Sequence, residues 1–208
     1  MNFLAHAWLA RRGSDAFLYG NLIADGVKGT CLDDWPVEVA LGIRHHRRVD
    51  AYVDHHPRIV GARRRAPDGT RRYAGIALDL VWDHFLARQL SADDQLIPRC
   101  YRLLAERPAP NRLATMVPVM VRQDWLRRYA DWHFTCRALE GLGERLDQRL
   151  SQGMKHDLAQ RRPGPSRLAE LIPWLNDDYQ GLGDDFGAFW PELGDVLEAA
   201  GSRTTRTD

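Results

Sequence analysis

Histidine and aspartate residues are concentrated in the first half of this 208-residue chain, where six of the eight histidines lie within the first 84 positions. Imidazole and carboxylate groups are the ligands that hold a hydrolytic divalent ion such as Mn²⁺, Mg²⁺, Fe²⁺ or Zn²⁺. A metal site assembled from several segments is therefore the first chemistry that the sequence indicates. The candidate residues are His6, Asp25, His46, Asp50, Asp54, Asp79, Asp83 and His84.

Two of these carboxylates belong to one apolar segment, Arg71 to Leu90. Asp79 and Asp83 are four residues apart, so they share one face of a helix, while His84 lies about 100° further round. A buried ionised carboxylate without a partner costs on the order of several kcal/mol, so this face requires a metal, an arginine or protonation. Arg72 lies two turns earlier on the same face. The spacing leaves a structural ion pair and a ligand role both open.

The segment from Val37 to His56 repeats this pattern, with His46, Asp50 and Asp54 at intervals of four residues. An aspartate one turn from a histidine can orient the imidazole and select its tautomer, as the partners of metal-bound histidines do. The same spacing is also common in pairs on the surface of helices, and the neighbouring arginines offer Asp50 alternative partners.

His6 and Asp25 each have a structural alternative to a ligand role. His6 lies in a very apolar segment, where a core histidine bonded to the backbone is the alternative, and Asp25 is also suited to a cap or a turn. Apolar neighbours on both sides of Asp25 nevertheless call for a stronger explanation. Gly20 and Gly26 would let a ligand approach the backbone closely, although they form no recognised phosphate loop.

The overall charge excludes a general nucleic-acid binder. The chain has 29 Lys and Arg against 28 Asp and Glu, for a formal net charge of +1. Arginines are nevertheless frequent between Arg63 and Arg72, where they would receive a phosphate or an acidic protein, because guanidinium groups pair with both kinds of oxygen. A solvated helix face is the alternative interpretation of this segment.

The remaining composition favours a cytoplasmic protein. The three cysteines are far apart in the sequence, which fits a reducing compartment. The N-terminus is apolar first and basic afterwards, the reverse of a signal peptide, and no stretch approaches the roughly 20 apolar residues of a membrane span. We expect neither export nor a membrane partner.

The elements that must position these residues are predicted to be helices alone. Apolar residues recur at helical spacing almost everywhere and strand patterns are nearly absent, so we expect an all-α, single-domain helical bundle over residues 1–200 with a flexible tail at 201–208. The apolar helix beginning at Arg71 should be central and buried. The expected helices cover 2–10, 15–29, 37–56, 71–90, 92–106, 112–129, 131–150, 166–179 and 185–199, with Ser14 and Asp34 as caps of the second and third.

Four ordered strings resemble one known family, the acyl carrier protein phosphodiesterases, also called ACP hydrolases. They are MNFLAH at 1–6, GNLIAD at 20–25, GI followed by HRRVD between 42 and 50, and LDLVWDHFL at 78–86. The likeness is dense over the first 90 residues and continues in later strings around Trp125 and Trp190. Residues 155–166 depart from the family pattern and are interpreted as an insertion.

The resemblance implies a manganese-dependent enzyme that removes the 4′-phosphopantetheine arm from the serine of holo-acyl carrier protein, with Mg²⁺ or Fe²⁺ as other candidate ions. The family is similar to the helical HD phosphohydrolases, although this chain has Asp83 before His84 instead of an adjacent His-Asp pair. By matching strings, the implied metal-site residues are His6, Asp25, His46, Asp79, Asp83 and His84, with Asp50 and Asp54 as the residues that orient them.

The resemblance also suggests roles in the reaction. Asp79, Asp83 or His84 would act as the general acid or base. Lys28 or an arginine, with Arg47 and Arg72 as the candidates, would counter the charge of the substrate phosphate. Two alternatives stay open: an HD-like hydrolase of a nucleotide or another small phosphodiester, and a non-catalytic module that binds acyl carrier protein.

Overall fold

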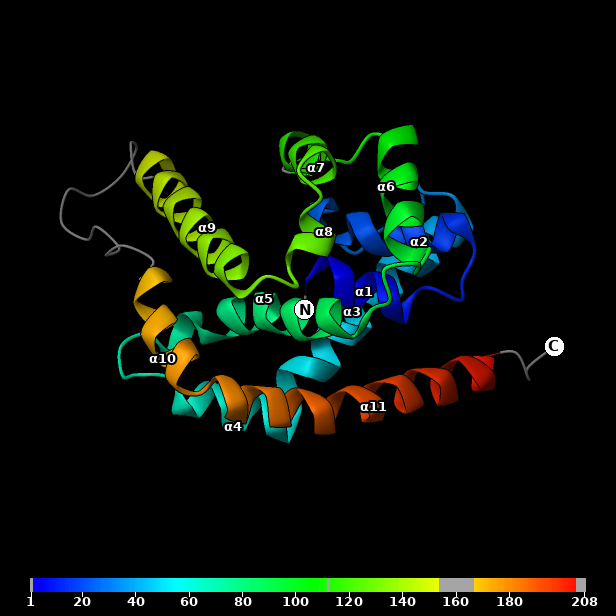
Figure 1. Ribbon diagram of the computed structural model, residues 1–208. Helices are drawn as coiled ribbons and strands as arrows, with labels where there is room; N and C mark the ends of the chain where they lie inside the picture. Colours follow the sequence, from blue (N-terminus) through cyan, green and yellow to red (C-terminus); the bar gives the residue numbers. More distant parts are fainter. Residues whose placement is uncertain (1, 112, 154–166, 205–208) are drawn as a thin grey trace.

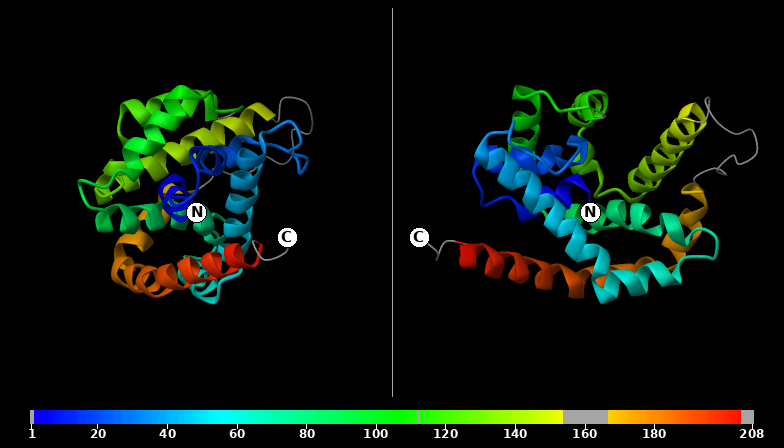
Figure 2. Two further views of the ribbon diagram at one scale, coloured as in Figure 1. Left: turned by 90° about the vertical axis from the view of Figure 1, so that its right-hand side faces the viewer. Right: turned by 180° about the vertical axis from the view of Figure 1, so that it is seen from behind.

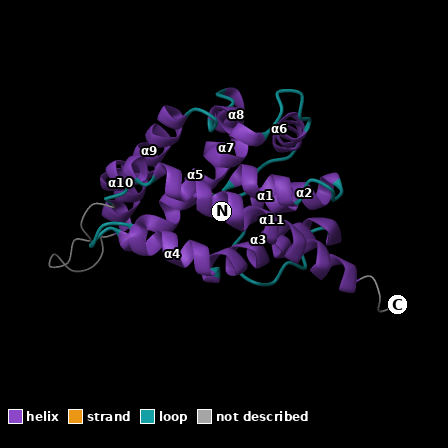
Figure 3. Ribbon diagram, turned by 60° about the horizontal axis from the view of Figure 1, so that its bottom comes forward, coloured by secondary structure: helices purple, strands orange, loops and turns teal. Residues whose placement is uncertain are grey.

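The structure is a computed structural model that describes residues 2–111, 113–153 and 167–204. Within these residues every regular element is a helix, so the all-α prediction is confirmed (Figure 3). The elements are α1 (Phe3–Leu9), α2 (Asp15–Ile23), η1 (Ala24–Gly26), α3 (Val37–His55), α4 (Pro57–Arg65), α5 (Arg71–Gln89), α6 (Leu96–Glu106), α7 (Leu113–Arg122), α8 (Trp125–Arg128), α9 (Trp132–Gly153), η3 (Ala169–Leu171), α10 (Ile172–Asp177) and α11 (Tyr179–Thr204).

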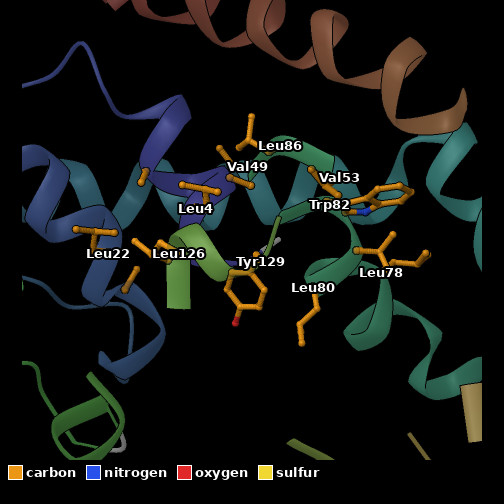
Figure 4. Packing of buried hydrophobic residues seen from close by; sticks show 14 of the residues in the cluster. Leu4, Leu22, Val49, Val53, Leu78, Leu80, Trp82, Leu86, Leu126 and Tyr129 are labelled. Carbon is orange, nitrogen blue, oxygen red and sulfur yellow. The ribbon is translucent and has the colours of Figure 1, made fainter. Parts of the chain in front are cut away.

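Helix α5 occupies the centre, as its apolar pattern predicts. It contacts α1, α4, α8, α9 and α11, and its side chains Leu78, Trp82 and Leu86 are almost completely buried (Figure 1). Figure 4 shows α1, α3 and α5 contributing Leu4, Val49 and Leu86 to the same packed region. The buried apolar residues form one cluster that runs from Leu4 to Leu193. A single core therefore joins the first and last helices.

Helices α2 and α3 pack against each other with their backbones in close approach. A Cβ atom added to Gly20 would lie 2.1 Å from the carbonyl oxygen of Val39, and one added to Gly42 would lie 2.1 Å from that of Phe17. Only glycine fits at either position. Gly20, which we expected to leave room for a ligand, instead leaves room for α3. Helix α3, which carries His46 and Asp50, runs as a long, straight helix along the back of the molecule (Figure 2, right).

Several helix ends differ from the sequence predictions. The predicted helix over 112–129 is divided into α7 and α8, because Asp124 has a left-handed backbone with φ of 52°. Helix α3 is preceded by Pro36 at its N-cap position rather than by Asp34. Ser14 does cap α2, with its hydroxyl accepting a hydrogen bond from the Phe17 amide at 3.1 Å.

The last helix is longer than predicted at both ends. Helix α11 begins at Tyr179 rather than Asp185 and continues to Thr204, past residue 200 where we expected the folded domain to end. Glycines at 181 and 183 lower the intrinsic helix propensity, but the burial of Leu182 and Phe186 outweighs it. The predicted insertion at 155–166 and the end of the predicted tail, 205–208, lie outside the described residues. None of the helices placed by the structure has the length and hydrophobicity needed to cross a membrane.

Candidate metal centre

Two histidines from different helices stack on each other beneath one carboxylate. The rings of His6 on α1 and His46 on α3 are 3.6 Å apart between centroids and nearly parallel, at 14°. Asp50, one turn after His46, reaches both rings: one carboxylate oxygen lies 3.0 Å from Nε2 of His6 and the other lies 3.2 Å from Nε2 of His46. Because Asp50 lies one turn after His46 on α3, its carboxylate can contact both His46 and His6, which is 40 residues before His46 in the chain.

Asp25 and the backbone of α2 complete the surroundings of His46. An oxygen of Asp25, on η1, lies 3.7 Å from Nε2 of His46, and the Asp25 side chain is 50% exposed. Nδ1 of His46 donates to the carbonyl oxygen of Asn21 at 2.9 Å. This bond becomes available because Gly20 and Gly42 bring α2 so close to α3. It directs Nε2 of His46 toward the two carboxylates.

The electrostatics of the cluster favour a positive charge at His46. Burial lowers its pKa, but the carboxylates of Asp25 and Asp50 more than offset this and raise the pKa to about 9. Burial and the neighbouring His46 lower the pKa of His6 to about 3. The pKa of Asp50 is raised by burial, but its bonds to the two histidines lower it well below the ordinary value. Cation binding between these carboxylates is thus electrostatically favoured.

The available ligand atoms fit a divalent ion. Ligand atoms of His6, His46 and Asp50 all lie within 4.8 Å of one another. Nε2 of His46 is buried and faces the carboxylates of Asp50 and Asp25, at 3.2 and 3.7 Å. A nitrogen in these surroundings is a suitable donor for Mn²⁺, Fe²⁺ or Zn²⁺ when the ion takes the place of its proton.

Asp79 on α5 lies within electrostatic reach of this cluster. Its side chain is partly buried, and burial raises its pKa. The negative charge of Asp50 adds to this increase, whereas the positive charge of Arg63 opposes it. Asp79 is therefore the carboxylate of α5 that the fold places near Asp50, while its neighbour one turn later has a different role.

That neighbour, Asp83, which we predicted as a metal ligand and an acid or base, lies outside the group formed by His6, His46 and Asp50. Its two oxygens accept hydrogen bonds from the backbone amides of Leu4 and Ala5, at 3.0 and 2.9 Å. Asp83 thus caps the first turn of α1, where the side chain of Asn2 makes no capping bond in the described structure. Burial raises the pKa of Asp83 to about 7, against the effect of the two amides. Asp83 positions the helix that carries His6.

His84, for which we made the same prediction, also lies outside this group. Its Nδ1 is 2.7 Å from the carbonyl oxygen of Tyr129, and its Nε2 is 2.7 Å from the hydroxyl of Tyr179. The ring also packs against Trp132. Both nitrogens are therefore engaged in joining α5 to the segments around α8 and α11, and His84 is a structural residue.

The predicted phosphate-binding cations have different environments. Arg47 donates to the carbonyl oxygens of Val27 and Gly29, at 3.0 and 2.8 Å, so it holds the loop after Asp25 instead of facing a ligand. The guanidinium of Arg72 lies over the ring of Tyr73, 4.6 Å from its centroid, and forms no ion pair with Asp79 or Asp83 in the described structure. Lys28 is exposed on the loop beside Asp25.

Asp54 and the arginine-rich segment are largely occupied by one another and by other acidic groups. Asp54 pairs with Arg63 instead of with a histidine of the cluster. Arg65 pairs with Asp178 and Asp185, each at 2.7 Å. The predicted docking surface between Arg63 and Arg72 therefore has fewer unoccupied cations than the sequence indicates.

Sequence reasoning underestimated two contributors. Asp50 was predicted only to orient other ligands, yet it contacts both histidines; the His-x-x-x-Asp spacing was the signal that could have promoted it. Asn111 was not predicted at all. It has a left-handed backbone with φ of 48°, and its side chain donates to the carbonyl oxygen of Gly26 at 2.8 Å, beside Asp25. No local pattern indicates such a long-range contact.

Comparison with known proteins places the chain in a family. The family model described as acyl carrier protein phosphodiesterase matches residues 1–160. Among curated proteins, the chain is similar to the acyl carrier protein phosphodiesterases of Yersinia pestis, with 35% identity over 204 residues, and of Shigella boydii serotype 4, with 36% over 201 residues. In both cases the match covers 93% of this chain and 95% of the relative.

A third relative, from Photorhabdus laumondii, carries the same name and is 37% identical over 214 residues, covering 96% of this chain and 95% of that protein. No solved structure matches the chain, so the predicted kinship with HD phosphohydrolases stays a prediction. The family model matches residues 1–160, and the three relatives match 93% or more of the chain. This chain belongs to the acyl carrier protein phosphodiesterase family.

Proposed function

We propose that this protein is a metal-dependent phosphodiesterase that hydrolyses the linkage between 4′-phosphopantetheine and serine in holo-acyl carrier protein. The observation that carries the metal dependence is the convergence of His6, His46 and Asp50, with Nε2 of His46 buried beside the carboxylates of Asp25 and Asp50. Family membership supports the substrate and the class of reaction.

His6, Asp25, His46, Asp50 and Asp79 are the residues that would hold the ion. When bound there, a divalent ion supplies Lewis acidity and lowers the pKa of water toward neutrality. Mn²⁺ is our first candidate, and Mg²⁺ or Fe²⁺ are the others. The mixture of imidazole nitrogens and carboxylate oxygens suits Mn²⁺ and Fe²⁺ better than Mg²⁺, which prefers oxygen ligands.

The protein's own residues have three tasks in this proposal. The Asn21 carbonyl and the Asp50 carboxylate hold the His46 ring in one orientation, so no side-chain rotation is needed when the substrate arrives. Asp25, half exposed, marks the side from which the phosphodiester enters. Asp79 is our candidate for the proton transfer, because Asp83 and His84 are engaged elsewhere.

The overall reaction is a hydrolysis. An oxygen of water forms a bond to phosphorus, the bond between phosphorus and the serine oxygen breaks, and a proton passes to that oxygen. The products are apo-acyl carrier protein, with its serine hydroxyl restored, and free 4′-phosphopantetheine. No oxidant, reductant or nucleotide is required.

Mass spectrometry of holo-acyl carrier protein tests the proposal directly. We expect incubation with the Mn²⁺-loaded protein to remove the mass of the prosthetic group, and prior treatment with a chelator to prevent this. The matched variant is Asp50→Asn, which keeps the side-chain size but removes the negative charge that faces both histidines.

Other outcomes would redirect the assignment. Intact holo-acyl carrier protein together with cleavage of a nucleotide phosphodiester would contradict the proposed substrate and favour an HD-like hydrolase of small molecules. A protein that neither binds Mn²⁺ nor cleaves, yet binds acyl carrier protein in a salt-sensitive manner, would contradict the enzymatic proposal and favour a binding module.

A further inference from the structure

Arg63, on α4, lies between the two helices that carry the carboxylates of the metal centre. One of its terminal nitrogens pairs with the carboxylate of Asp54 on α3, and the other lies 3.5 Å from the Asp54 carbonyl oxygen. On the opposite side its guanidinium covers Gly75 of α5. A Cβ added to Gly75 would lie 3.0 Å from Nη2 and 3.1 Å from Nε of Arg63. The guanidinium thus bridges α3 and α5.

This location is one helical turn from the centre on both helices. Asp54 follows Asp50 by four residues on α3, and Gly75 precedes Asp79 by four residues on α5, so each pair is adjacent on its helix surface.

The hydrogen-bonding capacity of Arg63 is not exhausted by these contacts. A guanidinium has five N–H donors, and the contacts with Asp54 use its terminal nitrogens. Nε of Arg63 is buried and has no hydrogen-bond partner in the described part of the protein. A buried donor without a partner is costly, on the order of 1–3 kcal/mol, so its retention needs an explanation.

We propose that Arg63 binds the non-bridging oxygens of a phosphate ester beside the metal centre, and that Asp54 is the positioning residue that holds the guanidinium there. This inference rests on the proposed function and deepens it. The planar guanidinium suits phosphate oxygens geometrically, and it carries a positive charge at every physiological pH. The same chemistry would accept inorganic phosphate, free phosphopantetheine or the carrier-protein diester, and the experiment below separates these sources.

The sequence suggested a phosphate or an acidic protein as the partner of the whole segment between Arg63 and Arg72. Here only one arginine of that segment is assigned to the phosphate. In the structure Arg64 is exposed to solvent, whereas Arg63 is turned inward against Asp54 and Gly75. Two adjacent arginines on α4 therefore have opposite surroundings, which provides a matched control.

The test compares Arg63→Gln with Arg64→Gln in the full-length protein. Three quantities are measured: Mn²⁺ affinity, the affinity of the Mn²⁺-loaded protein for inorganic phosphate by calorimetry, and kcat/KM with holo-acyl carrier protein. We expect Arg63→Gln to weaken phosphate binding at least about 10-fold, the loss of one charge-assisted contact, with Mn²⁺ affinity nearly unchanged. Arg64→Gln should leave both affinities at the wild-type level.

Further variants separate ligand contact from a structural role. If Arg63→Gln is too unstable to measure, Arg63→Lys keeps the charge but loses the planar geometry, and should still weaken phosphate binding. Gly75→Ala displaces the guanidinium by crowding and should weaken phosphate binding without changing any polar group. Added guanidinium ions should restore phosphate binding to Arg63→Ala but not to Asp50→Asn.

The outcomes distinguish this inference from the proposed function. If Arg63→Gln or Arg63→Lys binds phosphate and turns over holo-acyl carrier protein as wild type does, the Arg63 assignment is wrong while the proposed function stands. If the wild-type protein binds Mn²⁺ and phosphate but cleaves only a small phosphodiester, the phosphate site is supported and the carrier-protein source is excluded. A wild-type protein that does not bind Mn²⁺ overturns both.

Discussion

The cluster around His46 and the neighbouring pair Asp83 and His84 contain the same kinds of side chain, with histidines at similar depth, yet they differ in how their polar atoms are satisfied. Asp83 and His84 are almost completely buried, and His6 and His46 nearly so. Both oxygens of Asp83 and both nitrogens of His84 have partners in the protein. Nδ1 of His6 has no hydrogen-bond partner among the described residues, and Nε2 of His46 faces the partly exposed carboxylates of Asp50 and Asp25.

This contrast shows that burial and residue type do not by themselves mark a functional site. A carboxylate whose two oxygens accept hydrogen bonds from backbone amides already has its partners within the protein, and it serves as a helix cap. A buried imidazole whose nitrogen faces two carboxylates retains the capacity to bind a metal ion in place of its proton. The distinction depends on what each side chain faces, so mutations in the two regions should have different consequences.

The largest effect is expected from removing a group of the cluster. Asp50→Asn and His46→Gln should each lower kcat/KM toward holo-acyl carrier protein by at least about 100-fold and weaken Mn²⁺ binding, because either change removes a donor from the convergent set. Steady-state kinetics and metal titration measure this. Wild-type activity in both variants would contradict the functional difference between the His46 cluster and the pair Asp83 and His84.

Truncation of Asp83 should mainly destabilise the protein. Asp83→Ala leaves the amides of Leu4 and Ala5 buried without acceptors, which should cost about 2–4 kcal/mol in the free energy of unfolding. Chemical denaturation of the metal-free protein provides the measurement. An unchanged unfolding free energy would show that the cap contributes nothing.

The same residue predicts a pH dependence. Because the pKa of Asp83 is raised to about 7 in the folded protein, the folded state holds a proton between about pH 4 and pH 7 that the unfolded state has lost. Stability from this proton is therefore fully present below about pH 4 and is lost as the pH rises toward 7. The side chain of Asp83→Asn does not titrate, so the variant does not lose stability in this way. Wild type should therefore become progressively less stable relative to the variant as the pH rises from about 4 to about 7.

A smaller effect is expected at His84. His84→Phe removes the bonds to the Tyr129 carbonyl and the Tyr179 hydroxyl, but Thr135 and Arg88 still donate to these two groups. We expect a loss of about 1–2 kcal/mol in the free energy of unfolding, with Mn²⁺ affinity unchanged. A loss of Mn²⁺ binding in a folded variant would contradict this expectation and assign His84 to the metal site.

The smallest effect is expected from the residues that hold the segment around Asp25. Asn111→Gly keeps the left-handed backbone but removes the bond to the Gly26 carbonyl, and Arg47→Met removes the bonds to Val27 and Gly29. Each should weaken Mn²⁺ binding by less than about 10-fold, because Asp25 stays in place but is less well oriented. Lys28→Gln, on the same loop, is the control and should leave Mn²⁺ affinity unchanged.

Much of the helical framework could be predicted from the sequence because periodic burial is a local signal. The ranges of α3 and α5 agree closely with the apolar spacing, and the buried, central position of α5 follows from apolar residues all round it. The break between α7 and α8 at Asp124 was not predictable in the same way, since the residue with the left-handed backbone is an aspartate and neither a glycine nor a proline.

The candidate site was predictable only in part for a related reason. The structure brings His6, Asp25 and His46 together, and the sequence had grouped them through the resemblance of ordered strings rather than through spacing. Asp79 and Asp83 are the same type of residue on the same face of the same helix, so their local sequence gives no basis for assigning them different roles. What separates them is that the N-terminus of α1 lies against Asp83.

By itself the sequence determined that this chain is helical, that α5 is its central helix and that acidic and imidazole groups accompany the core, because these properties depend on residues within a few turns of one another. Only the tertiary structure decided which of those groups converge. Hydrogen-bond partners are supplied by segments tens of residues away, and a polar side chain becomes a cap, a brace or a ligand according to which of them the fold places opposite it.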